Sequence, residues 1–118
     1  MPSTNLELKA VDPSCNPYLA LGAVLAAGLD GIDRGIDPGE PLMSDPSDVP
    51  EEERERRGIR RLPTTLREAL DHLEKDEVLR GALGDVLGRE YLALKRSEWR
   101  GFEGKDVGYE IEKHFYAY

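Results

Sequence analysis

Cysteine, histidine and long apolar runs are scarce in this 118-residue chain. The single cysteine, Cys15, excludes a disulfide framework and a cysteine-based zinc site. The histidines, His72 and His114, lack the HExxH spacing of a zinc protease, and neither a GxGxxG nor a P-loop sequence is present. No apolar run approaches the roughly 18 residues of a membrane-spanning helix, and no signal peptide opens the chain. We therefore predict a cytoplasmic location.

Positive charge is also in deficit. Sixteen lysines and arginines stand against 24 acidic residues, which gives a formal net charge of −8. Because nucleic acids attract basic proteins through their phosphates, an acidic chain is not expected to be a general nucleic-acid binder. The same charge disfavours adhesion to an anionic membrane surface. We therefore expect neither nucleic acid nor membrane among the partners.

Proline is absent from the last 55 residues, because all eight prolines lie at or before Pro63. Since proline breaks helix interiors, this distribution predicts an irregular first half and a helical second half. The length and the ordinary apolar content favour a single domain over 1–118. The predicted fold is mainly α, a small helical bundle with one N-terminal β-strand. Its predicted elements are a strand within 1–11 that is extended at 5–10, a buried helix at 16–31, a loop at 32–61, and a helical region at 62–118 with helices at 65–75, 76–83, 86–102 and 107–116.

The predicted strand depends on the alternation of apolar and other side chains from residue 6 to residue 11, which is the period of a half-buried strand. Leu6 and Leu8 share one face. Glu7 and Lys9 share the other. A lone strand leaves both edges unpaired and is rarely stable. The strand therefore requires a sheet that this sequence does not supply.

Asn16 and Pro17 predict the start of the first helix, since asparagine favours the N-cap and proline the first helical position. The run at 18–29 is apolar on every side, and such a helix is normally buried all round. In a chain this small, full burial requires the other helices or a partner subunit. The aromatic end at 114–118 is also predicted to dock.

Capping residues mark the helices of the second half. Thr65 and Glu68 form a capping box, and an apolar stripe that includes Leu70 follows it. The three later helices have predicted N-caps at Asp76, Asp85 and Asp106. Within the loop, the mixed-charge run at 51–57 is predicted to be a solvated helix turn.

Glu7 and Lys9 are the candidate site residues, and the pair permits two interpretations. In the first, the side chains form a weak surface ion pair. In the second, they line the floor of a site in which the carboxylate holds a divalent metal and the ammonium group holds an anionic substrate. Cys15 has no histidine nearby in sequence and is interpreted as a small buried residue.

Several sequence blocks resemble glutamine synthetases. The run LELKAVDPSCNPYLAL at 6–21 is similar to the last catalytic strand and following helix of that family, and AGLDGI at 27–32 continues it. Similarity to the family's C-terminal helices is carried by the shorter blocks LPTTL, EAL, DEVL, ALG and KRSEW between residues 62 and 99. The resemblance covers essentially the whole chain. It implies a single partial domain, the C-terminal portion of the glutamine synthetase catalytic domain.

This resemblance implies a cytoplasmic ligase that phosphorylates the glutamate side chain with ATP and lets ammonia displace the phosphate. The family's active site lies between neighbouring subunits of a ring and holds divalent cations, Mg²⁺ or Mn²⁺. Glu7 corresponds to the glutamate that ligates the metal on the nucleotide side, and Lys9 to an arginine that contacts substrate glutamate; no catalytic residue is assigned. Two departures weaken this carry-over. Asn5 stands where the family usually has arginine, and Lys9 lacks the bidentate fork of a guanidinium group.

The similar blocks begin at the last catalytic strand, so most of the family's sheet and its other metal, ATP and ammonia ligands are not encoded here. One carboxylate does not make a magnesium site in water, because Mg²⁺ gives up hydration reluctantly. We therefore expect a C-terminal segment that is inactive alone and binds no cofactor alone, although the family implies ATP and Mg²⁺ or Mn²⁺.

A second interpretation is a stand-alone helical interaction protein that self-associates, or that docks on and modulates a full-length glutamine synthetase. The opening sequence MPST and the departures at residues 5 and 9 favour it. Both interpretations predict a homo-oligomer or a complex with a full-length glutamine synthetase-like subunit. A third is a family branch that ligates amines other than ammonia.

Overall fold

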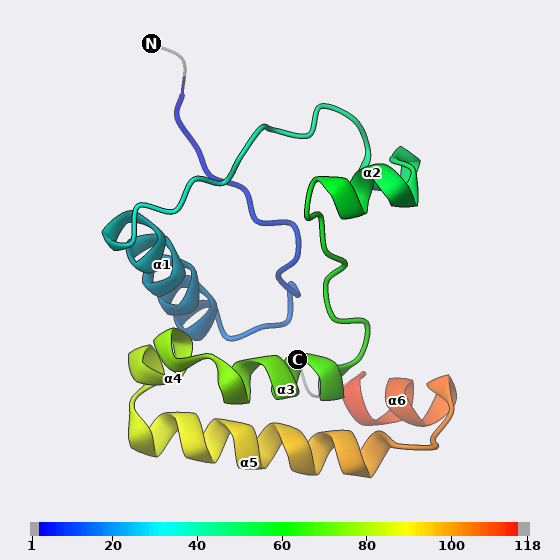
Figure 1. The fold of residues 1–118 in the computed structure, drawn as a ribbon. Helices are drawn as coiled ribbons and strands as arrows, with labels where there is room; N and C mark the ends of the chain where they lie inside the picture. Colours follow the sequence, from blue (N-terminus) through cyan, green and yellow to red (C-terminus); the bar gives the residue numbers. More distant parts are fainter. Residues whose placement is uncertain (1–2, 116–118) are drawn as a thin grey trace.

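A computed structural model describes residues 3–115, and every regular element in that range is a helix (Figure 1). None of these helices is long and apolar enough to cross a membrane. The mainly α class predicted from the sequence is confirmed. The elements in chain order are α1 (Pro17–Asp33), the 3-10 turn η1 (Pro46–Asp48), α2 (Glu51–Arg56), α3 (Leu66–Lys75), α4 (Glu77–Leu83), α5 (Asp85–Phe102) and α6 (Val107–His114).

The predicted N-terminal strand is wrong for the chain as described. Residues 5–10 are irregular, and no strand occurs anywhere between residues 3 and 115. The segment runs by itself along the molecule, with Leu6 and Leu8 exposed (Figure 1). A strand is held by a ladder of hydrogen bonds to a neighbour, and the described chain offers none.

The predicted helix starts are mostly confirmed by their caps. The side-chain oxygen of Asn16 accepts hydrogen bonds from the backbone N–H groups of Tyr18 and Leu19, at 3.0 and 3.2 Å. At the starts of α4 and α6, Asp76 and Asp106 each accept a backbone N–H at 2.9 Å. Each side chain satisfies a backbone donor that has no partner within the helix.

The capping box of α3 is present in a slightly shifted form. The Thr65 hydroxyl oxygen accepts the backbone N–H of Glu68 at 3.1 Å. The Glu68 carboxylate reaches back to the N–H of Thr64, at 2.8 Å, one residue before the N-cap. These bonds from Thr64 hold the pKa of Glu68 below its ordinary value, because they favour the charged carboxylate.

Asp85 does not cap α5, contrary to the sequence-based prediction. Gly84 occupies the N-cap position with φ of 76°, and Asp85 is the first helical residue. Gly84 also ends α4, so a single glycine in the left-handed region joins the two helices. This shared residue leaves no place for a separate cap, although the Asp85 carboxylate still complements the helix dipole.

The region from residue 34 to residue 65 is irregular except for η1 and the six-residue α2, which confirms the helix turn predicted at 51–57. Arg57 fastens this region to itself by donating from Nη2 to the backbone oxygen of Glu40 at 2.9 Å. At the other end of the chain, α6 ends at His114, and residues 116–118 of the aromatic tail lie outside the described residues.

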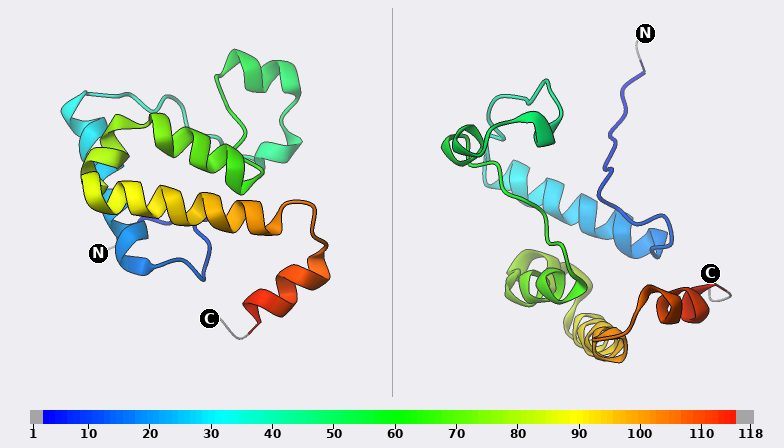
Figure 2. Two further views of the ribbon diagram at one scale, coloured as in Figure 1. Left: turned by 90° about the horizontal axis from the view of Figure 1, so that it is seen from below. Right: turned by 90° about the vertical axis from the view of Figure 1, so that its right-hand side faces the viewer.

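Packing is concentrated in the second half of the molecule. Helices α3, α4 and α5 contact one another, and α4 also contacts α1 (Figure 2). Among the described hydrophobic residues, only Val49 and Leu70 are buried. The prediction that the first helix is buried all round is wrong within this chain, because no residue of α1 is buried. Contact with the short α4 covers only one of its sides.

Candidate functional site

Glu7 and Lys9 lie on the irregular N-terminal segment and form an ion pair. The distance from Lys9 Nζ to Glu7 Oε1 is 3.5 Å, and the side chains are 84% exposed for Lys9 and 69% exposed for Glu7. The weak surface ion pair, the first interpretation of these residues, is therefore present. Because water screens both groups, the pair adds little to stability.

The donor set around Glu7 does not by itself fit a magnesium or manganese ion. Nowhere in residues 3–115 do three histidine, cysteine, aspartate or glutamate residues gather closely enough to hold a metal. Mg²⁺ prefers a nearly octahedral set of oxygen ligands. Glu7 offers one carboxylate, and the neighbour of that carboxylate is a cation. Glu7 thus provides a single ligand side chain at this position.

The segment DPSCNP connects the irregular N-terminus to helix α1 through two successive side-chain acceptors, Asp12 and Asn16. Asp12 Oδ1 accepts from both the N–H and the hydroxyl of Ser14, each at 2.7 Å, which holds the pKa of Asp12 below its ordinary value. The backbone N–H of Cys15 then donates to the backbone oxygen of Asp12 at 3.0 Å. Asn16 caps the helix immediately afterwards. This turn joins the irregular N-terminal segment to the start of α1.

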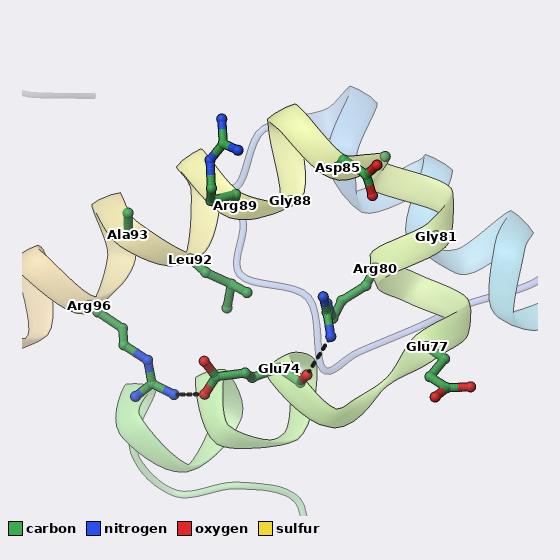
Figure 3. A pocket seen from close by; sticks show the side chains of 11 residues that line it. Glu74, Glu77, Arg80, Gly81, Asp85, Gly88, Arg89, Leu92, Ala93 and Arg96 are labelled. Carbon is green, nitrogen blue, oxygen red and sulfur yellow. Dashed lines mark hydrogen bonds and ion pairs between the residues drawn. The ribbon is translucent and has the colours of Figure 1, made fainter.

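The structure also contains an open groove of about 830 Å³ where α3, α4 and α5 meet, which sequence reasoning missed (Figure 3). Arg96 crosses it from α5, and its Nη2 donates to Asp71 Oδ1 at 2.8 Å and to Glu74 Oε2 at 2.6 Å. Arg80 Nη1 donates to the backbone oxygen of Glu74 at 3.2 Å. The charged residues that line the groove are Glu74, Glu77, Asp85, Arg80, Arg89 and Arg96.

These contacts make the groove a clamp between helices. Its acidic and basic side chains are equal in number, so it does not concentrate charge of one sign. The bonds of Arg96 join residues that are 22 and 25 positions apart in sequence. Neither helical periodicity nor a local motif predicts such pairs. The only signal in the sequence was the presence of Arg96 inside the KRSEW block.

The clamp predicts acid sensitivity. The hydrogen bond from Arg96 holds the pKa of Asp71 below its ordinary value. A carboxyl group whose pKa is lowered by folding stabilises the fold above about pH 4, and this contribution is lost as the pH falls through the lowered pKa. We expect the helical circular dichroism signal to fall as the pH is lowered below about 4, and to fall less steeply in Arg96→Gln.

The matched control is Arg89→Gln. Arg89 pairs with Glu90, its neighbour in the same helix, and so joins no two elements. Its pH profile should follow that of the unchanged chain. Superimposable profiles for Arg96→Gln and the unchanged chain would show that the clamp does not contribute to acid stability.

Comparison with known proteins places these features in a family. Residues 1–114 match the family described as glutamine synthetase, catalytic domain. The glutamine synthetase of Archaeoglobus fulgidus is 44% identical over 110 residues, which cover 93% of this chain and 22% of the relative. That of Thermus thermophilus is 42% identical over 115 residues, covering 98% and 26%. The glutamate–methylamine ligase of Methyloversatilis universalis is 48% identical over 98 residues, covering 83% and 22%.

The chain thus spans about a quarter of the length of the curated relatives that it matches. The match confirms the resemblance carried by the blocks at 6–21 and 27–32, and it runs on through the capped helices of the second half. The chain belongs to the glutamine synthetase catalytic-domain family, as a segment similar to the C-terminal part of that domain.

Proposed function

We propose that this chain acts as the C-terminal segment of a glutamate–amine ligase and contributes Glu7 and Lys9 to an active site that groups outside the segment complete. The observation that carries the proposal is the family match over residues 1–114 combined with the exposure of this charged pair. Both side chains are available to a partner element, since each is mostly in contact with water. In this proposal the segment is inactive alone and works within a cytoplasmic oligomer or on a family subunit.

The two side chains have different proposed roles. A carboxylate is a preferred ligand of Mg²⁺ and Mn²⁺, so Glu7 would supply one of several oxygen ligands. When bound, such a cation neutralises the phosphate oxygens of ATP. Lys9 would hold the carboxylate of substrate glutamate as a compact positive charge, without the bidentate geometry of arginine. Lys9 lies 3.5 Å from Glu7 in a weak, exposed ion pair, so this contact would not prevent Glu7 from serving as a metal ligand.

The proposed acceptor amine is ammonia, as in the relatives named glutamine synthetase. A second candidate is methylamine, which is favoured by the 48% identity to a relative named glutamate–methylamine ligase. An assay of the assembled enzyme with both amines decides between the two.

The alternative function is modulation of a full-length family enzyme by a stand-alone interaction protein. The observation that favours it is the exposed apolar side of α1, which is suited to contact another protein. A modulator changes the rate of an intact enzyme, whereas a catalytic segment restores the rate of an incomplete one. These two effects are separable in a single assay.

The test measures phosphate release from ATP in the presence of glutamate and amine. We expect no turnover by the purified chain, and glutamine formation when it is co-expressed with a Thermus thermophilus glutamine synthetase that lacks the segment matching this chain. Turnover by the chain alone at about 1 per second or faster would contradict the proposal. A changed rate of the intact relative, without rescue of the shortened one, supports the modulator instead.

A further inference from the structure

One side of α1 is an apolar stripe that the rest of the described chain leaves uncovered. At about 100° per residue, its large side chains fall within one third of the helix circumference. They are between 57% and 85% exposed. No charged residue occurs between Pro17 and Leu29. The large side chains of this stripe are Tyr18, Leu21, Leu25, Leu29 and Ile32.

Two glycines, Gly22 and Gly28, lie on the same side of α1 as this stripe. A Cβ atom placed at either position would meet no other atom of the described chain within 4 Å. Neither has the positive φ that only glycine adopts easily. Glycine weakens a helix interior relative to alanine, and nothing within the described chain requires it here. Glycine at a helix surface permits another backbone to approach closely.

The exposed area of the molecule indicates a large partner. The solvent-accessible surface is 10521 Å². A compact monomer of 13.2 kDa exposes roughly 6,400 Å². The radius of gyration is 17.1 Å, whereas a compact chain of this length has about 13.5 Å. A standard interface covers only about 800 Å² per partner, so pairing of α1 with a second copy would leave most of the excess exposed.

We infer that the α1 stripe seats on the portion of a glutamine synthetase-family catalytic domain that the matched relatives possess and this chain does not span. Gly22 and Gly28 are the points at which the partner's backbone comes closest. The relatives are about four times as long as the matched segment, which provides a partner of the size that the excess area requires. The inference rests on the proposed function and names its docking surface.

The experiment uses Gly22→Ala and Gly28→Ala in the full chain, with Gly101→Ala as the matched control. Gly101 is an exposed helical glycine of α5 with open space around its Cβ position, away from the stripe. Because alanine favours helix, none of the three variants should unfold the chain, and each should raise the thermal midpoint by a few degrees, about 4 °C. Stability thus acts as the internal control.

Binding should separate the variants. The partner is the shortened Thermus thermophilus enzyme, obtained by co-expression, and affinity is measured by competition between tagged and untagged chains. We expect Gly22→Ala and Gly28→Ala to bind about tenfold more weakly or worse, because a methyl group in a close-packed contact forces the backbones apart. Gly101→Ala should bind like the unchanged chain. Equal binding by all three variants, or no binding by the unchanged chain, overturns the inference.

The failures of the two proposals are distinguishable. Glycine-sensitive binding without glutamine formation leaves the docking surface in place and contradicts the proposed function. Glutamine formation that is insensitive to both glycine variants keeps the function and overturns the surface. Sedimentation of the chain alone provides a third outcome. A dimer that dissociates in Gly22→Ala and Gly28→Ala would identify a second copy as the occupant and overturn the partner assigned here.

Discussion

Replacing Leu70 by alanine is expected to lower the free energy of unfolding by about 2–5 kcal/mol, the usual cost of removing a buried leucine side chain. Leu70 is 3% exposed, and Val49 is the only other hydrophobic residue that is buried in the described chain. Leu70 lies on α3, which packs against both α4 and α5. A cavity at this position therefore weakens the contacts that hold the helices of the second half together.

Urea denaturation followed by far-UV circular dichroism measures this effect. The matched control is Leu66→Ala, at the first residue of the same helix, since Leu66 is 39% exposed. Its loss removes less area from the interior and should cost under about 1 kcal/mol. Equal losses for the two variants would show that burial at Leu70 does not carry the stability of this region.

The helices were predictable because their signals are local. Asn16, Thr65, Asp76 and Asp106 each cap a helix from within three residues of the donor that they satisfy. Such bonds depend on sequence spacing alone, so reading the sequence is sufficient to find them. The same local signal led to the wrong assignment of Asp85. Aspartate favours the N-cap position, but Gly84, with its positive φ, occupies that position in α5.

The strand and the burial of the first helix were wrong because both depend on partners. Alternation at residues 6–11 describes a side-chain pattern that suits a strand, but pairing requires a second strand. Likewise, the apolar run at 18–29 favours a helix that other parts of a protein cover on all sides. The described chain covers only its α4 side. In both cases the residues favour an environment that this chain does not itself provide.

In the candidate site, too, contacts between residues close in sequence were predictable, and contacts that depend on helix packing were not. The contact between Glu7 and Lys9 was predicted from their shared face on a strand, and the ion pair is present although the segment that carries it is irregular. Their roles as metal and substrate ligands were one of two interpretations of the charged pair, were assigned to specific ligands by family resemblance, and remain a proposal. The clamp at Arg96 was not predictable, because its partners on α3 are distant in sequence and reach it through the packing of α3 on α5.

Within the assembled ligase, we expect Glu7→Gln to reduce the rate of glutamine formation by about 100-fold or more. The substitution keeps the shape of the side chain but removes the charge of a proposed metal ligand, and even residues that only support a ligand typically matter 10–100-fold. Glutamine formation is measured with the co-expressed, shortened Thermus thermophilus enzyme. A rate within threefold or so of the unchanged assembly would contradict the metal role.

The isolated chain provides the control, because there the same substitution should do almost nothing. Glu7 is mostly exposed, and its ion-pair partner among residues 3–115 is the exposed Lys9, so its loss should alter the free energy of unfolding by under about 0.5 kcal/mol. Calorimetric titration of the isolated chain should show no tight Mn²⁺ binding, since Glu7 alone offers one carboxylate beside a cation. Micromolar Mn²⁺ affinity that disappears in Glu7→Gln would instead place a complete metal site within this chain or its oligomer. The proposal that outside groups complete the site would then have to be abandoned.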